Sequence, residues 1–173
     1  MYFKRIDFNC SDKVNLFDKL VAGEAFPIRL GIASFAKPLK NIKNVVESLH
    51  EHNIKCIVIT VGPKQVAKVV CDIWGFDGYY GSDYEVLEGV FTGKILNYIG
   101  VEQKIECLQD FCKYNSINSN ECIAVGDGST DIPIFEYCGK SIAINSSPKV
   151  RKSAMYAVDT DDLTDILKYI LCA

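Results

Sequence analysis

Apolar positions along the chain follow two different spacings. Residues 54–60, IKCIVIT, and residues 121–125, ECIAV, are short and largely apolar, which is typical of strands buried inside a parallel sheet. Elsewhere apolar residues recur three or four positions apart, as in an amphipathic helix. Strands that alternate with helices predict an α/β domain built on a central parallel sheet. Further strands are predicted over residues 2–8 and 141–144, and helices over residues 41–53, 63–75, 101–115 and 161–171.

Three connecting segments carry signals of their own. Residues 84–94, YEVLEGVFTGK, place Glu-Gly between two β-rich arms, which predicts a hairpin. Residues 127–139 begin as a loop and continue as a helix, and residues 147–154 predict a helical turn. No repeat or linker interrupts the pattern, so residues 1–173 are expected to form a single domain.

Composition and charge narrow the functional classes. Hydrophobic residues make up 49% of the chain, and the formal net charge is −3. A chain with this charge lacks the basic field that binds nucleic acid. Its apolar runs are far shorter than the roughly 20 residues of a membrane span, and charges occupy the N-terminus where a signal peptide would be apolar. We therefore expect a cytoplasmic protein that binds neither nucleic acid nor membranes.

The cysteines and histidines give no sign of a metal site. None of the eight cysteines belongs to a Cys-x-x-Cys pair of the kind that binds structural zinc. Most lie within apolar patterns and are expected to be reduced and buried. Cys10 lies in the suspected catalytic loop, but a nucleophilic role for it is the less favoured interpretation. His50 and His52 are predicted to be solvated residues on the polar side of their helix.

Polar residues with catalytic potential follow the predicted strands. Asp7, Thr60 and Asp127 each stand at the end of a strand, and Asp131 follows at the start of a helix. The carboxyl ends of parallel strands meet at one edge of a sheet, where ligands bind. Two aspartates there suit Mg²⁺, while Thr60 and Lys104 could hold phosphate oxygens and Asp7 could attack phosphorus. The arrangement predicts a phosphoryl-transfer site.

Each of these residues also has a simpler interpretation. An aspartate after a strand is often a turn or helix-capping residue, and a lysine on a helix is usually solvated. The order and spacing of the residues together favour the catalytic interpretation.

In this order and spacing the sequence resembles the haloacid dehalogenase superfamily, and within it the phosphoserine phosphatase-like branch. The four motifs are DFNCS at residues 7–11, IVITVGP at residues 57–63, Lys104, and AVGDGSTDIPIFEYCG at residues 124–139. The resemblance implies a Rossmann-like three-layer sandwich with a central parallel sheet, and Mg²⁺ as cofactor. It implies that Asp7 is the nucleophile, that Asp127 binds the metal, and that Asp131 supports the metal or its waters.

Three motif positions depart from the family pattern. The second aspartate of the first motif, the family's general acid/base, is Asn9 here, and an amide cannot exchange a proton near neutral pH. The backbone carbonyl of Asn9 can still bind Mg²⁺. Val61 replaces the glycine after Thr60, and Thr130 replaces an asparagine, so the phosphate contacts are expected to be altered.

The cap that covers the active site in this branch is also reduced. Residues 12–36 leave room only for a short cap or linker segment, so little or no cap domain is expected. The glutamate that reads the substrate's amino group in the family corresponds to Leu16, so specificity for phosphoserine is not implied. An open site suggests that a second subunit or a large substrate closes it. Besides a phosphorylated small molecule, the expected partners are therefore a second copy of the chain, in a homo-oligomer, or a phosphorylated macromolecule.

These observations favour an Mg²⁺-dependent phosphate monoester hydrolase that works through an aspartyl-phosphate and is attenuated by Asn9. The alternative from another class is a non-hydrolytic module that binds a phosphorylated ligand or a protein. A third interpretation is that Asn9 was introduced deliberately to trap an inactive enzyme.

Overall fold

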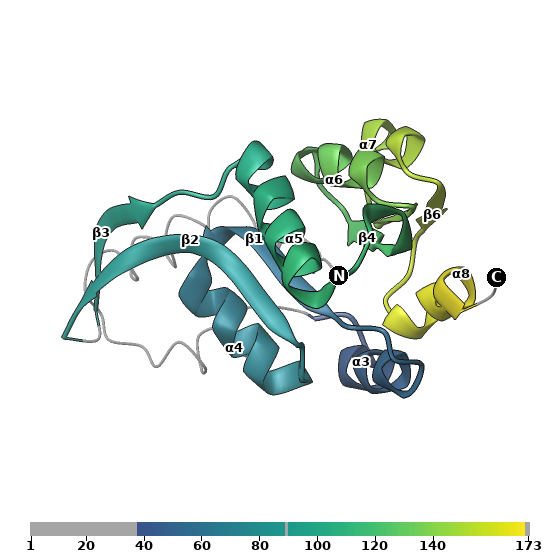
Figure 1. Cartoon of the computed structure of the whole chain (residues 1–173), viewed down its shortest axis with the longest axis horizontal. Coiled ribbons are helices and arrows are strands. Elements are labelled where there is room, and N and C mark those ends of the chain that lie inside the picture. The colour runs from purple at the N-terminus through teal and green to yellow at the C-terminus, as the bar shows by residue number, and fades with distance from the viewer. Residues whose placement is uncertain (1–37, 89, 172–173) are drawn as a thin grey trace.

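The computed structural model describes residues 38–88 and 90–171 (Figure 1). The strand predicted over residues 2–8, and the cap or linker segment predicted over residues 12–36, lie outside the described residues. The single-domain assignment therefore stays a prediction.

The first sheet is built around one long strand. Strand β2 (Gly78–Leu87) pairs in parallel with β1 (Ile57–Pro63) through its first half. Its second half pairs antiparallel with β3 (Val90–Asn97), which forms the predicted hairpin. Glu88 adopts a left-handed conformation with φ of 51°, as the tight turn between the two strands requires. The hairpin extends away from the rest of the described chain, as Figure 1 shows.

The second sheet is entirely parallel. Strand β5 (Lys140–Ile144) lies between β4 (Ile123–Gly126) and β6 (Tyr156–Val158). In the described part of the chain, β1 and β4 belong to separate three-stranded sheets. The predicted α/β class with parallel strands is confirmed.

The predicted helices are present, with small shifts in their bounds. Helix α3 (Ile42–Glu51) buries the apolar stripe that predicted it, and α4 and α5 lie beside the first sheet (Figure 1). The segment 161–171 is less regular than predicted, because it begins as a 3₁₀ turn before its last residues become α-helical. The other helices are α4 (Lys64–Trp74), α5 (Val101–Asn115), α6 (Ile132–Tyr137), α7 (Pro148–Ser153) and α8 (Leu167–Leu171), and the 3₁₀ turns are η1 (Ser119–Glu121), η2 (Ser129–Asp131) and η3 (Leu163–Ile166).

Two stretches of strand were not predicted from the sequence. The first half of β2 (Gly78–Leu87) begins at a glycine and mixes tyrosines with glycine and aspartate, so it lacks alternation. The three residues of β6 are too few to show a period. Both become strands because a neighbouring parallel strand offers hydrogen bonds, which local sequence does not encode.

The core joins both sheets to the helices. One cluster packs the buried face of α3 and α4 against Val58, Val125 and the isoleucines of β5. A second cluster places Ile57, Ile59, Ala124 and Ala143 against α5 and α6. Residues of β1 and β4 occur in both clusters, so the two sheets share one interior.

Two expectations, on membrane spans and on the state of the cysteines, can be compared with the described residues. None of the helices in residues 38–88 and 90–171 is long and apolar enough to cross a membrane. The six described cysteines are free thiols in buried or half-buried positions, as predicted, whereas Cys10 and Cys172 lie outside the described residues.

Ile142 tests the packing of this shared core. It is 0% exposed in the central strand β5 (Lys140–Ile144). We expect Ile142→Ala to lower the free energy of unfolding by about 2–5 kcal/mol, because it leaves a cavity between strand and helices. Urea denaturation measures the change. Tyr114→Ala is the control, since Tyr114 is 90% exposed, and equal losses in the two variants would contradict this account of the core.

Candidate active site

The loop after β4 is folded around one carboxylate. Asp127 directly follows the strand, and Asp131 closes the 3₁₀ turn η2. The Oδ2 atom of Asp131 accepts hydrogen bonds from the N–H groups of Asp127, at 3.2 Å, and Gly128, at 3.0 Å. Asp131 is 2% exposed, whereas Asp127 is half-buried. The buried aspartate therefore fixes the backbone that carries the more accessible one.

Gly126 provides the space for this carboxylate. A Cβ atom at Gly126 would lie 2.6 Å from Oδ2 of Asp131, well inside van der Waals contact. The first glycine of the Gly-Asp-Gly sequence is therefore required by close approach. This gives a steric reason for part of the motif.

Lys104 reaches the same carboxylate from α5. The helix begins after Gly100, whose N–H donates to Oε1 of Gln103 at 3.0 Å. Lys104 lies four residues after Gly100, and its side chain is 0% exposed. Its Nζ donates to Oδ1 of Asp131 at 2.7 Å and to Oγ1 of Thr130 at 3.2 Å. Lys104 is thus in direct contact with Thr130 and Asp131, and the phosphate-binding roles predicted for Lys104 and Thr130 stay predictions.

Two opposing effects act on the Lys104 ammonium. Burial is the larger and lowers the pKa of Lys104, while the negative charges of Asp131 and Asp127 raise it. A buried charge is costly unless it is paired, and the 2.7 Å ion pair supplies that pairing. The lysine is therefore held at one position by its electrostatic partners.

Thr60 and Val61 lie within β1 (Ile57–Pro63). The structure corrects the prediction that Thr60 ends this strand, because the parallel pairing with β2 resumes at Pro63 after an irregularity. Both residues are half-buried, and Oγ1 of Thr60 accepts a hydrogen bond from the N–H of Gly62 at 3.0 Å. The hydroxyl is thereby oriented beside the irregular end of the strand.

Ser82 is a positioning residue that the sequence analysis missed. Its hydroxyl donates to the carbonyl oxygen of Val61 at 2.8 Å and accepts from the N–H of Ile99 at 2.9 Å, and it is 0% exposed. It therefore ties the Thr60 segment to the chain that enters α5. A single serine in an irregular pattern gives no signal for this role, which depends on contacts across the fold.

The donor set fits Mg²⁺ in its chemistry. Asp127 and Asp131 supply hard carboxylate oxygens within one rigid loop, as this ion prefers. Both oxygens of Asp131 already accept hydrogen bonds. Asp131 is therefore better placed to hold the loop that carries Asp127 than to bind a metal directly. Asp7 and Asn9 lie outside the described residues, and their meeting with this cluster stays a prediction.

Residues 96–170 match the protein family of haloacid dehalogenase-like hydrolases. Similar curated proteins include the phosphoserine phosphatase of Saccharomyces cerevisiae, 36% identical over 134 residues, which are 76% of this chain and 43% of that protein. The phosphoserine phosphatase of Streptococcus thermophilus is 28% identical over 132 residues, which are 76% of this chain and 61% of the relative. The chain thus spans between 43% and 61% of the length of these two relatives.

Solved structures show the same fold. An apo phosphoserine phosphatase superposes with a TM-score of 0.77 at 24% identity, covering 91% of this chain and 83% of the other. A phosphoserine phosphatase described as a phospho-aspartyl intermediate analogue gives a TM-score of 0.74 at 25% identity, covering 90% and 76% of the two chains.

The sequence match includes the residues that the structure brings together. Lys104, Thr130 and Asp131 all lie within residues 96–170, and the Gly-Asp-Gly loop lies there with them. Residues 96–170 therefore match the haloacid dehalogenase-like hydrolases, and the chain is similar to phosphoserine phosphatases over about three quarters of its length.

Proposed function

We propose that this protein is an Mg²⁺-dependent phosphatase that hydrolyses a phosphate monoester through an aspartyl-phosphate on Asp7. The observation that carries the proposal is the buried ion pair of Lys104 and Asp131 beside Asp127. A domain that serves only as a scaffold gains little from a lysine that is 0% exposed, because desolvating charges is expensive. A phosphoryl-transfer site does need a fixed positive charge.

The relatives support the reaction class more strongly than the substrate. Several are named phosphoserine phosphatases, and the chain spans only part of them. We propose a phosphorylated small molecule as substrate, with a phosphorylated macromolecule as the alternative. Leu16 stands where the family's amino-group ligand is expected, so a substrate without that group is favoured.

In the proposed reaction each residue acts at a stated atom. The Thr60 hydroxyl, the Val61 backbone N–H and the Lys104 ammonium bind oxygens of the phosphate, and the Thr130 hydroxyl orients the ammonium. The Asp7 carboxylate attacks phosphorus as the ester oxygen leaves, and water then hydrolyses the aspartyl-phosphate.

Magnesium would be held by the carboxylates of Asp7 and Asp127 and the carbonyl oxygen of Asn9. Asp131 would support that arrangement through the backbone of the loop. The ion would supply positive charge at the phosphate and so offset repulsion between the two anions.

Asn9 is the reason to expect low turnover. An amide cannot protonate the leaving oxygen or activate water, and such catalysis is typically worth about 10²–10⁴-fold. The same residue favours the second candidate function, a module that binds a phosphorylated ligand or a protein without hydrolysing it.

Replacing Asn9 by aspartate distinguishes the phosphatase from the binding module. We expect Asn9→Asp to raise turnover of an alkyl phosphate by about 10²-fold or more. The gain for an aryl phosphate should be smaller, because a good leaving group needs little protonation. Steady-state rates on both substrates measure the effect.

Asp7→Asn provides the control for that experiment and should abolish activity on both substrates. Equal and negligible rates in wild type and Asn9→Asp would contradict catalysis by Asp7 and favour the binding module.

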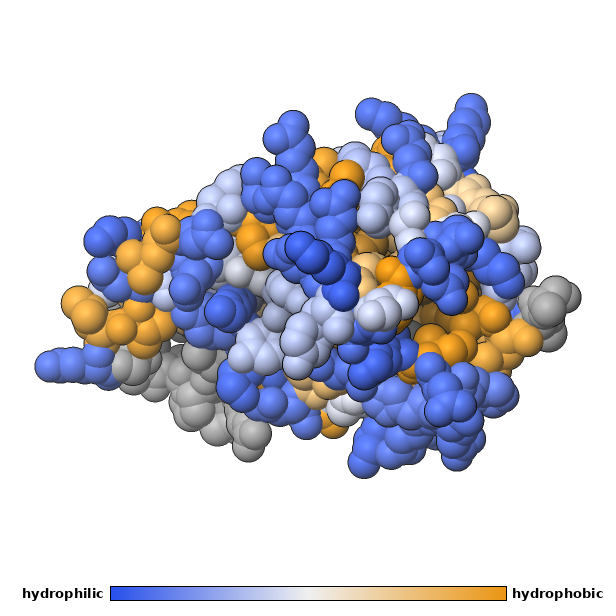
Figure 2. All heavy atoms as spheres, viewed as in Figure 1, coloured by the Kyte–Doolittle hydropathy of each residue, from blue (hydrophilic) through white to orange (hydrophobic). Residues whose placement is uncertain are grey.

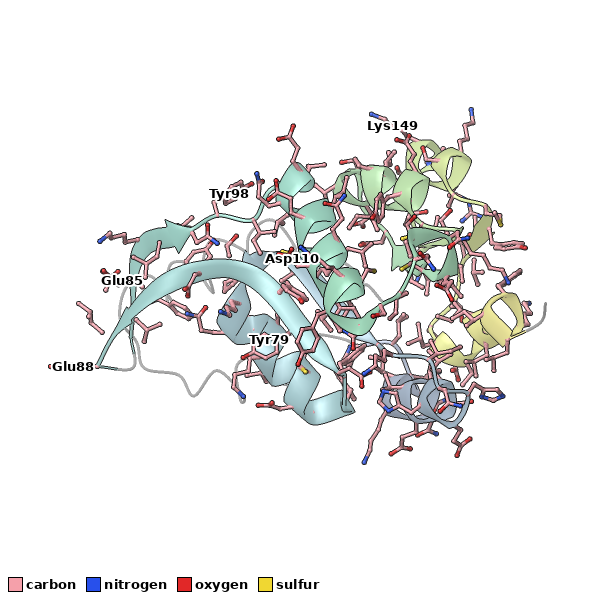
Figure 3. All side chains as sticks on the ribbon, in the orientation of Figure 1. Tyr79, Glu85, Glu88, Tyr98, Asp110 and Lys149 are labelled. Atoms are coloured by element: carbon pink, nitrogen blue, oxygen red, sulfur yellow. The ribbon has the colours of Figure 1, made fainter. Side chains whose placement is uncertain are left out.

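Magnesium binding gives a test that does not depend on turnover. We expect Asp127→Asn to weaken the affinity for Mg²⁺ by about tenfold or more in calorimetry, because one carboxylate ligand is lost. Asp110→Asn is the matched control, since Asp110 is an exposed aspartate on α5 (Figure 3). Equal affinities in the two variants would contradict the metal assignment.

We propose that self-association through the hairpin closes the site. Exposed apolar side chains occur on the hairpin and on the segment after it, and Figure 2 shows hydrophobic residues among polar ones at the end of the molecule where Figure 3 labels Glu85 and Glu88. The exposed fractions are 61% for Leu87, 55% for Leu96 and 61% for Tyr98. Burying such surface against a second copy is favourable.

Light scattering tests this association. We expect wild type to form a homo-oligomer, and the double variant Leu87→Ser and Leu96→Ser to shift towards the monomer. Tyr114→Ser is the control on α5 (Val101–Asn115), away from the hairpin. A monomeric wild type would contradict self-association and leave a large substrate as the means of closure.

A further inference from the structure

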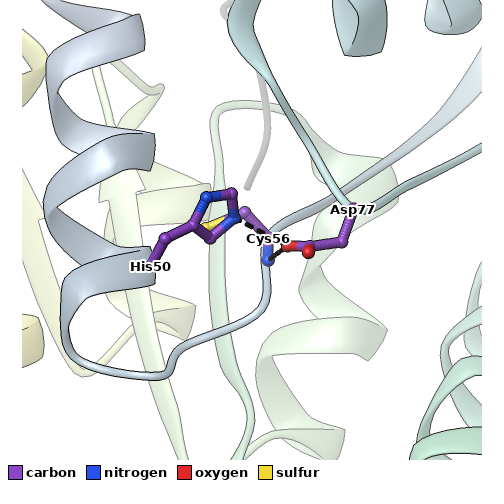
Figure 4. Close-up of side chains that lie close together, drawn as sticks. All are labelled: His50, Cys56 and Asp77. Carbon is purple, nitrogen blue, oxygen red and sulfur yellow. Dashed lines mark hydrogen bonds and ion pairs between the residues drawn. The ribbon is translucent and has the colours of Figure 1, made fainter.

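A second group of metal-binding side chain types lies at the start of β1, the end opposite Thr60. His50 comes from the last turn of α3, Cys56 directly precedes β1, and Asp77 directly precedes β2 (Figure 4). These are the N-terminal ends of two parallel strands, whereas the candidate active site lies at the C-terminal ends. The group is therefore separate from the phosphoryl-transfer site.

Asp77 connects the other two residues. Its Oδ2 atom lies 2.9 Å from Nε2 of His50 and accepts a hydrogen bond from the backbone N–H of Cys56 at 2.6 Å. The N–H of Asp77 donates in turn to the carbonyl oxygen of Cys56 at 2.7 Å. A ring nitrogen, a sulfur and a carboxylate oxygen all lie within 4.8 Å of one another.

Hydrogen bonding explains only part of this arrangement. The Asp77 carboxylate satisfies the N–H at the start of β1 and forms a polar pair with His50, as many surface aspartates do. The Cys56 thiol takes part in neither contact, and its Sγ lies 3.8 Å from the carbonyl oxygen of Ile54, a weak interaction. Cys56 also packs in the core beside α3 and α4, where it is 4% exposed, and its sulfur lies within 4.8 Å of the other two donor atoms.

We propose that His50, Cys56 and Asp77 bind a divalent transition metal, with Zn²⁺ as the best match. Zinc takes nitrogen, sulfur and carboxylate ligands at about 2.0–2.3 Å, which places tetrahedral ligand atoms about 3.3–3.8 Å apart. The side chains of His50 and Asp77 are 37% and 28% exposed, which leaves them room to adjust towards that geometry. Water from the exposed side completes the fourth position.

The metal would bind the sulfur of Cys56 as a thiolate, because the thiolate is the form that coordinates metals. Binding therefore releases the thiol proton to solvent and forms a metal–thiolate bond. The neutral His50 ring would coordinate through Nε2 and keep its proton on Nδ1.

A bound metal would stabilise the fold. His50, Cys56 and Asp77 belong to three segments that meet only through packing and hydrogen bonds. A shared ion would link them by coordination bonds in the native state alone. A ligand that binds only the folded protein stabilises it in proportion to its concentration over its dissociation constant. The oxygen-preferring Mg²⁺ would not compete for a site with sulfur and nitrogen ligands.

Titration with Co²⁺, as a coloured substitute, and with Zn²⁺ tests the proposal. The full chain is kept reduced, and excess Mg²⁺ is present to occupy the active site. We expect one equivalent of Co²⁺ to give a thiolate charge-transfer band that Zn²⁺ abolishes, and Zn²⁺ to raise the melting temperature. Cys56→Ser should remove the band, and His50→Gln should weaken Zn²⁺ binding by tenfold or more.

Matched variants keep the outcome decisive. His52→Gln changes the other histidine of the same helix end, and Cys107→Ser changes a half-buried cysteine on α5. Both should bind Zn²⁺ as wild type does. If Cys56→Ser fails to fold, the two histidine variants still decide. Absence of the band in wild type, or equal weakening by His50→Gln and His52→Gln, would overturn the proposal.

Discussion

The buried contact between Lys104 and Asp131 constrains the rest of the candidate active site. A carboxylate and an ammonium withdrawn from water must pair and must satisfy their remaining hydrogen bonds, because an isolated buried charge is strongly unfavourable. Asp131 meets this requirement by accepting from Lys104 and from two N–H groups of its own loop. The loop, the helix that carries Lys104 and the glycine beside the carboxylate are thereby fixed relative to one another.

The fold supplies the surroundings that this pair needs. Helix α5 packs against β1, and α6 packs against β4, so one interior holds both elements of the ion pair at a constant separation. Ser82 extends the same rigidity to the Thr60 segment, because its hydroxyl joins Val61 to Ile99 near the start of α5. Preorganised charge of this kind is what phosphoryl transfer demands, since the transition state offers the protein little covalent chemistry.

The chain also separates its chemistry between the two ends of its strands. Carboxylate oxygens and the buried lysine stand near the carboxyl ends, where the phosphoryl-transfer site is proposed. A softer set of nitrogen, sulfur and oxygen donors stands at the amino ends of β1 and β2. In the function proposed for this chain, Asn9 would weaken acid/base catalysis while the metal and phosphate ligands stay in place. Low turnover and retained binding would then be compatible within one site.

The sequence by itself determined the α/β class, the hairpin and the order of the motifs, because hydrophobic period, Glu-Gly turn chemistry and the Gly-Asp-Gly spacing are local properties. It also singled out Lys104 and Asp131 before their contact was visible. Only the tertiary structure decided that Asp131 is saturated by three donors, that Ser82 positions the Thr60 segment, and that His50 meets Cys56 and Asp77. The contacts of Lys104 with Asp131, of Ser82 with Ile99 and of His50 with Asp77 join residues 17 to 27 positions apart through packing that no local pattern encodes.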